Sequence, residues 1–106
     1  MEATPLGRFA SASFLILASL ADGPKHGYAM MQDIRAFSGT HLEAGTLYGC
    51  IARLEQLKWI EALPMEDRRR PYQLTAAGVA AFRRHVVTLN HVTRVSMARL
   101  TTLEAP

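Results

Sequence analysis

Apolar residues recur three and four positions apart in several stretches of the chain, which is the spacing of amphipathic helices. A first helix is predicted over residues 11–21, a second over 26–37 and a third over 44–57. Turn-forming segments, DGP at 22–24 and SGTH at 38–41, separate them. The predicted inward-facing residues are, in chain order, Phe14, Leu17, Leu20 and Ala21; Tyr28, Met31, Ile34 and Phe37; and Leu47, Ile51, Leu54 and Leu57.

The pattern changes between residues 59 and 74. The segments WIEALP and PYQLT are rich in β-forming residues and flank the charged segment MEDRRR. This order predicts a two-stranded hairpin with a charged tip. Pro64 and Pro71 suit the ends of its strands, because proline is rarely found in a central strand.

The last stretch, residues 76–106, is predicted to form one helix with Thr75 as its N-cap. The helix would be about 42 Å long, which is too long for the core that residues 1–75 can build. Its apolar seam has heptad-like spacing and predicts pairing with a second helix. The seam consists of Val79, Phe82, Val86, Leu89, Thr93, Ser96, Leu100 and Leu103. Its two polar members fit an exposed turn, and a register device or the wall of a ligand site would explain them as well.

Three helices followed by a hairpin is the order of a winged helix-turn-helix, so the predicted fold class is mainly α with a small β wing. In such domains the third helix enters the major groove of DNA. Gly45 and Gly49 each cost that helix about 1 kcal/mol relative to alanine, and bare backbone there would allow close approach to DNA. Thr46 and Tyr48 add hydroxyl groups. A helix-start glycine and a core tyrosine are the structural alternatives for Gly45 and Tyr48.

Charge supports a polyanionic partner only modestly over the whole chain, with 12 lysines and arginines against 9 acidic residues among 106. The positions of the charged residues are more informative than their total. Arg68, Arg69 and Arg70 lie at the predicted hairpin tip, from which they could reach phosphates or a minor groove. A solvated basic turn, partly neutralised by Glu66 and Asp67, would have the same sequence.

Other chemistry finds little support. Cys50 is the only cysteine, so no intrachain disulfide can form, which fits the reducing cytoplasm. The four histidines show no metal-ligand spacing, and no nucleophile–base pair is evident, so neither an enzyme nor a metal or other cofactor is expected. The apolar segment FASASFLILASLADG is too short to span a membrane and is better explained as a core helix than as a signal peptide.

Three segments resemble the PadR family of bacterial transcriptional regulators: ILASLADGPKHGYAMMQDI, AGTLYGCIARLEQLKWIEA and RRPYQLTAAGVAAF. The HGY, GTLY and Y-x-LT-x-x-G motifs appear in the family's order and separations. The chain resembles the compact members with one C-terminal helix. Compared with the family pattern, Glu43 replaces a better N-cap, Gly49 a larger residue and Lys58 a glycine.

The resemblance implies a cytoplasmic homodimeric repressor that binds a pseudo-palindromic operator in double-stranded DNA and is released by a small aromatic or lipophilic effector. The predicted DNA-binding residues are Lys25, His26, Tyr28, Gly45, Thr46, Tyr48, Gly49, Arg53, Arg68, Arg69 and Arg70. The predicted dimerisation residues are the seam residues Val79, Phe82, Val86, Leu89, Thr93, Leu100 and Leu103. A candidate effector pocket involves Phe9, Phe14, Trp59, Leu89 and Val92. A protein-interaction module without DNA binding, and a ligand sensor with a secondary DNA role, are the alternatives.

Overall fold

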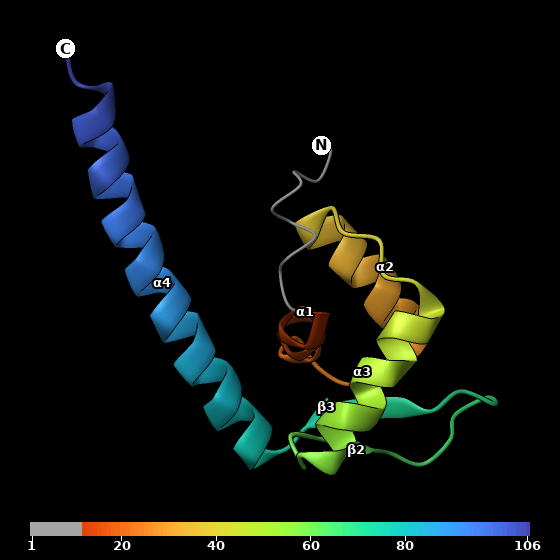
Figure 1. Ribbon diagram of the computed structural model, residues 1–106. Coiled ribbons are helices and arrows are strands. Elements are labelled where there is room, and N and C mark those ends of the chain that lie inside the picture. The colour runs from red at the N-terminus through yellow and green to blue at the C-terminus, as the bar shows by residue number, and fades with distance from the viewer. Residues whose placement is uncertain (1–11) are drawn as a thin grey trace.

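The computed structural model describes residues 12–106 as a small helical body from which one long helix extends (Figure 1). The elements in chain order are α1 (Ala12–Leu20), β1 (Lys25–His26), α2 (Gly27–Ser38), α3 (Ala44–Gln56), β2 (Ile60–Ala62), β3 (Pro71–Leu74) and α4 (Ala76–Glu104). This architecture confirms the predicted winged helix-turn-helix with a long last helix.

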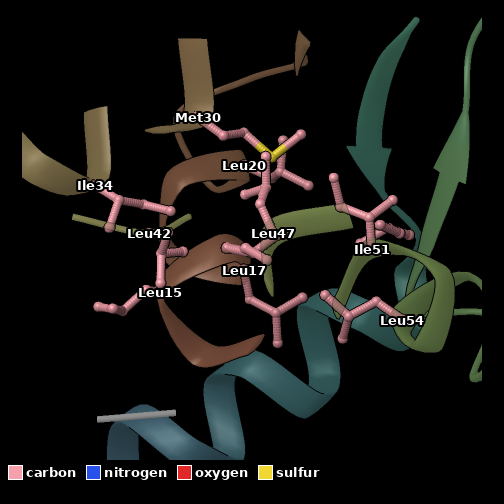
Figure 2. Packing of buried hydrophobic residues seen from close by; sticks show 11 residues of the cluster. Leu15, Leu17, Leu20, Met30, Ile34, Leu42, Leu47, Ile51 and Leu54 are labelled. Carbon is pink, nitrogen blue, oxygen red and sulfur yellow. The ribbon is translucent and has the colours of Figure 1, made fainter. Parts of the chain in front are cut away.

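Helix α1 lies at the centre of the body and packs against α2, α3, α4 and β3. Its residues Leu15, Leu17 and Leu20 are buried (Figure 2), and so is Ile16. A helix that is apolar on all sides is typically buried, which explains the unusually apolar segment near the start of the chain. The predicted inward face of this helix was therefore partly wrong. It left out the buried Leu15 and Ile16, and it included Phe14, which is only half-buried, and Ala21, which is exposed.

Helices α2 and α3 form the helix-turn-helix pair. In α3 the predicted core residues Leu47, Ile51 and Leu54 are buried, whereas Leu57 is half-exposed. In α2 the prediction was partly wrong, because Met30 and Ile34 form the inward face while Tyr28 and Phe37 are exposed. The apolar residues of α2 cover more than half of its circumference, so their spacing alone could not distinguish the core face from the other.

The sheet has three antiparallel strands in the order β1-β3-β2, not the two that were predicted. Strand β1 contains only two residues, and Lys25 and His26 pair with Tyr72 and Pro71 of β3. The sequence could not indicate a strand too short to show alternation. Pro71 is the first residue of the central strand, where its missing N–H is tolerated.

Helix α4 packs on the body only through its first turns, and Gly78 and Ala81 are its buried residues. Thr75 is the N-cap, as predicted, and its hydroxyl accepts a hydrogen bond from the Gly78 amide at 3.0 Å. From there the helix runs beside the body to the C-terminus (Figure 1). Within residues 12–106, no helix combines the length and the apolarity that crossing a bilayer requires.

Candidate nucleic-acid interface

The outer face of α3 is the first component of the interface. Burial of Leu47, Ile51 and Leu54 turns the opposite side of the helix to solvent. The predicted DNA-binding residues of this helix all lie on the exposed side: Gly45, Thr46, Tyr48, Gly49 and Arg53. The N-cap residue Glu43 makes no side-chain hydrogen bond to the helix, so its poor capping leaves first-turn amides available to an external acceptor.

The two glycines of α3 have no packing role within the described chain. A Cβ placed on Gly45 or Gly49 would meet no atom within 4 Å. Neither residue has a positive φ angle, so backbone conformation does not require glycine either. The structure therefore shows no contact among the described residues that requires glycine at either position.

Tyr48 joins α3 to the start of α2. Its ring lies against Gly27, where an added Cβ would overlap the Tyr48 hydroxyl and come within 2.8 Å of Cζ. Tyr48 is still 51% exposed, so its other face remains open. The HGY and GTLY motifs thus meet in space, and the role of Gly27 in this contact was not recognised from the sequence.

His26 is the N-cap of α2, and its Nδ1 atom accepts a hydrogen bond from the Ala29 amide at 3.3 Å. Its Nε2 atom lies 3.2 Å from Nη1 of Arg69 in the wing. Tyr28, in the first turn of α2, is 57% exposed, and its hydroxyl accepts a hydrogen bond from Gln32. The contact with Arg69 places His26 next to the wing.

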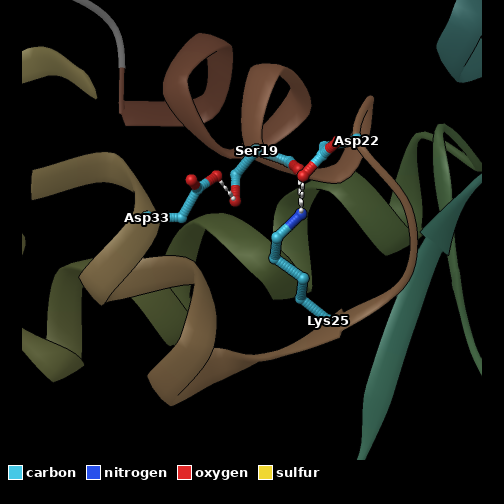
Figure 3. Close-up of polar contacts among 4 residues, drawn as sticks. All are labelled: Ser19, Asp22, Lys25 and Asp33. Carbon is cyan, nitrogen blue, oxygen red and sulfur yellow. Dashed lines mark hydrogen bonds and ion pairs between the residues drawn. The ribbon is translucent and has the colours of Figure 1, made fainter. Parts of the chain in front are cut away.

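Lys25 is placed differently from the other predicted DNA-binding residues. Its ammonium group donates to the Ser19 carbonyl oxygen at 2.6 Å and lies 3.7 Å from the Asp22 carboxylate (Figure 3). Ser19, which is fully buried, in turn donates to Asp33 on α2 at 2.8 Å. The Lys25 charge is held at the C-terminal end of α1, where the helix dipole favours a cation, and is not gathered with the wing arginines.

The wing ends in a tight two-residue turn. Glu66 and Arg69 exchange two backbone hydrogen bonds of 2.8 Å. Between them Asp67 and Arg68 have φ angles of 47° and 67°, as in the type I′ turn that matches the twist of a hairpin. Arg68 lies in this turn at the tip, whereas Arg69 contacts His26.

Between the strands and the turn, residues 63–65 lie outside β2 and β3. The Leu63 amide donates to the Pro71 carbonyl oxygen at 2.8 Å. The guanidinium of Arg70 donates to the Leu63 carbonyl oxygen at 2.7 Å and so links the two sides of the wing.

α2, α3 and the wing enclose a shared hollow of about 310 Å³. Its lining residues are His26, Gly27, Tyr28, Tyr48, Met65, Arg68, Arg69 and Arg70. Among the described ion pairs, none involves the three arginines, although Glu66 and Asp67 are close in the chain. The hollow therefore combines uncompensated positive charge with hydroxyl and ring N–H groups, the donors that bind phosphate oxygens.

Tyr72 of β3 adds no negative charge near this hollow. Burial raises the pKa of its phenol, the Glu55 carboxylate and the Tyr48 phenol raise it further, and the Arg70 guanidinium opposes them. Because the ordinary pKa of tyrosine is already near 10, the Tyr72 phenol is neutral at physiological pH.

The predicted dimerisation residues lie on α4 and, apart from the half-buried Phe82, are exposed in the single chain. Val79, Phe82, Val86 and Val87, with Arg83, surround an apolar hollow of about 290 Å³. Further along the helix, Leu89, Val92, Met97, Leu100 and Leu103 are also exposed. So many apolar residues on one protruding helix form a surface that usually marks an interaction site.

The predicted effector residues are only partly brought together. Phe14 and Trp59 line a hollow of about 210 Å³ between α1, α4 and the start of β2, together with Ser13, Leu17, Ala81 and His85. Phe14 also stacks near Phe82 and His85, with ring centroids 5.6 Å and 4.6 Å apart. Leu89 and Val92 lie further along α4, outside this hollow, and Phe9 lies outside the described residues.

Metal or thiol chemistry gains no support from the part of the chain described here. Residues 12–106 contain no group of three histidine, cysteine or acidic side chains arranged to hold a metal ion. Cys50 is a free, half-buried thiol on α3 that packs against the core.

Comparison with known proteins gives a consistent result. Residues 16–84 match the model of the transcriptional regulator PadR-like family. A 37.1 kDa protein in transposon Tn4556 of Streptomyces fradiae is 48% identical over 67 residues, which cover 63% of this chain and 19% of that protein. The matched segment therefore spans about a fifth of the length of this relative.

Solved structures of similar fold cover nearly the whole chain. A PadR family transcriptional regulator from Eggerthella lenta is 29% identical, with a TM-score of 0.70 over 95% of this chain and 88% of that one. A PadR family transcription regulator from Clostridium difficile has a TM-score of 0.76 at 22% identity, over 84% of this chain and 97% of that one. A transcriptional regulator from Clostridium thermocellum has the same TM-score at 23% identity, over 90% and 95% of the two chains.

Proposed function

The chain belongs to the PadR-like family of transcriptional regulators, and from this we propose that it is a sequence-specific, homodimeric DNA-binding repressor that acts in the cytoplasm without catalytic activity. Helix α3 enters the major groove, and the wing and the start of α2 contact the flanking phosphates. Two such units read a pseudo-palindromic operator whose half-sites are about 34 Å apart.

One observation carries the DNA-binding proposal. The exposed face of α3 has bare backbone at Gly45 and Gly49 that no contact within the described chain explains. The three wing arginines stand beside this face, and no described ion pair neutralises them. Close backbone approach and uncompensated positive charge are together what binding to a duplex requires.

Dimerisation is supported by the length and surface of α4. Its 29 residues correspond to about 43 Å, and only its first turns pack on the body. A second copy would cover the exposed apolar seam, and pairing of two α4 helices would fix the separation of the two α3 helices. Repression would follow from occupying the operator in place of the transcription machinery.

Effector control is proposed at the hollow between α1 and α4, where Phe14 and Trp59 lie. A small aromatic or lipophilic compound fits its apolar and aromatic lining. The hollow is lined by residues of α1, at the centre of the body, and of the first turns of α4. A bound compound would therefore change the angle between the body and α4. Such a change alters the spacing of the two recognition helices and releases DNA.

The proposal is tested by measuring binding of the purified protein to the DNA upstream of its own coding region, at two salt concentrations, against a scrambled duplex. We expect preferential binding that weakens steeply with salt, with two chains per site. An absence of binding to any duplex at low salt would contradict the proposal. That result, together with capture of a partner protein on the exposed face of α3, would favour the interaction-module alternative.

A further inference from the structure

Both ring nitrogens of His26 face an N–H donor. The Ala29 amide lies 3.3 Å from Nδ1, and Nη1 of Arg69 lies 3.2 Å from Nε2. A neutral imidazole has one lone pair and one N–H, and a guanidinium group can only donate. The ring can therefore accept a hydrogen bond from only one of these two groups.

The Ala29 amide is the donor that the lone pair of the His26 ring accepts from. It belongs to the first turn of α2, where amides have no partner within the helix, and the backbone holds it in place. Arg69 is exposed, and its long side chain is not held by the backbone. With Nδ1 accepting from Ala29, the proton of the neutral ring lies on Nε2. The Nε2–H of His26 and an N–H of Arg69 then converge, two donors without an acceptor between them.

The surroundings of this pair select an anionic acceptor. A hollow of about 390 Å³ opens beside it, lined by His26, Glu66, Asp67, Arg69 and Pro71. Neither carboxylate forms an ion pair with Arg69 among the described residues. The adjoining hollow adds Arg68 and Arg70, with the hydroxyls of Tyr28 and Tyr48. Three cations against two carboxylates leave a positive balance, and α3, the DNA-facing helix, lines the same region.

We propose that His26 and Arg69 together hold one phosphate of the DNA backbone, and that His26 does so as the neutral ring protonated on Nε2. The phosphate oxygen supplies the acceptor that both donors lack. Since one donor belongs to the first turn of α2 and the other to the wing, the bound phosphate would fix the wing relative to the helix-turn-helix. This inference rests on the proposed DNA-binding function and adds to it a named phosphate contact and a protonation state.

Two substitutions separate the two roles of His26. In His26→Asn the amide oxygen can take over the cap, because asparagine is a favoured N-cap, but no donor reaches the Nε2 position. In His26→Gln the amide NH₂ reaches that position, but glutamine caps poorly. We expect His26→Asn to keep the thermal stability and lose about tenfold in DNA affinity per chain, the effect of one hydrogen bond to a charged group. His26→Gln should lose stability and keep most of the affinity. His91→Asn, on the exposed part of α4, is the matched control and should change neither.

The salt dependence reports the charge of His26. Each cation that neutralises a phosphate contributes about 0.9 to the slope of log affinity against log salt. Arg69→Gln should lower that slope by about 0.9 per chain, whereas His26→Asn should lower affinity and leave the slope unchanged. When the contacted phosphate is replaced by a neutral methylphosphonate, the wild type and both variants should bind the modified operator with the same affinity. Nitrogen-15 NMR of the free protein should show a pyridine-type Nδ1 and a pyrrole-type Nε2.

The outcomes distinguish this inference from the function on which it rests. If the wild type binds its operator and His26→Asn binds equally well, the phosphate contact is wrong and the repressor proposal stands. A pyridine-type Nε2, or a slope that falls in His26→Asn, overturns the assigned protonation state. If the wild type binds no duplex, both proposals fail.

Discussion

Three residues other than glycine have positive φ angles among the described residues, namely Lys58, Asp67 and Arg68, and two of them show different reasons for this conformation. Lys58, with φ 62°, ends the turn after α3, and Arg68, with φ 67°, lies at the wing tip. L-residues pay a conformational cost there that glycine avoids. At Lys58 the family pattern has a glycine, so the lysine keeps the expected turn and tolerates the strain. At Arg68 the same cost places a cation at the proposed DNA surface.

Replacing Lys58 by glycine should therefore stabilise the protein. The turn stays the same and the strain is removed, so we expect a gain of about 1 kcal/mol, or roughly 4–8 °C in melting temperature for a domain of this size. Thermal unfolding followed by circular dichroism measures it. A lower melting temperature would mean that glycine does not relieve strain at this turn.

Arg68→Gly is the matched variant at the wing. It should raise the melting temperature by a similar amount, because the backbone relief is the same. Operator affinity should fall, and the salt slope should drop by about 0.9 per chain as one phosphate contact is lost. If stability rises while affinity and slope stay at wild-type values, the wing arginine has no role in DNA binding.

At the scale of elements, one junction joins α3, β2, β3 and α4. The Thr75 hydroxyl donates to the Lys58 carbonyl oxygen at 2.6 Å, and the Thr75 amide donates to that of Trp59 at 3.0 Å. Gly78 packs so closely on Trp59 that an added Cβ would overlap its carbonyl oxygen and lie 2.8 Å from its carbonyl carbon. The threonine and glycine of the LT-x-x-G motif thus set the direction in which α4 leaves the body.

Gly78→Ala should be strongly destabilising, although alanine is the better helix former. The new methyl group meets fixed backbone, so α4 must shift away from the body. We expect a loss of about 2 kcal/mol or more, in the range of overpacked cores, measured by urea unfolding.

Gly49→Ala is the control for helix propensity. Its Cβ meets nothing within 4 Å, so stability should rise by up to about 1 kcal/mol. Its operator affinity should nevertheless fall, because the methyl group would hold α3 away from DNA. Equal stability effects in the two glycine variants would contradict the close packing at Gly78.

For the whole molecule, the contrast between a compact body and a protruding helix leads to a prediction about dimerisation. The structure measures 59 × 29 × 20 Å along its principal axes, and apart from Phe82, which packs against the core, the apolar seam residues of α4 are exposed. Such a surface is stable in water when a second copy covers it, and a dimer with fixed geometry is what a two-fold operator requires.

Leu89→Glu places a charge in the middle of that seam and should convert the proposed dimer into a monomer. Sedimentation analysis should show half the wild-type mass, and affinity for a two-half-site operator should fall at least a hundredfold, while weak binding to a single half-site persists. Thr88→Glu is the matched control, because its hydroxyl bonds to the Arg84 carbonyl oxygen on the same helix and the residue is not in the seam. A Leu89→Glu protein that remains dimeric would place the interface elsewhere.

The sequence by itself determined the helices, their order and the wing, because apolar periodicity, turn residues and caps act over a few neighbouring positions. Thr75 shows this: its capping role was readable from the residue and the apolar pattern that follows. Short motifs also indicated the family, since their spacing reflects one fold. Local signals could equally show that α4 exceeds what the body can pack.

Only the tertiary structure decided which residues meet. Gly27 matters because Tyr48, from another helix, lies on it, and β1 exists because β3 passes beside it. The tertiary structure also decided that the Lys25 charge lies at the end of α1. It likewise decided that Met30, and not Tyr28, is buried in the core. Packing and hydrogen bonds between segments distant in the chain depend on positions in space, and no pattern of neighbouring residues specifies these.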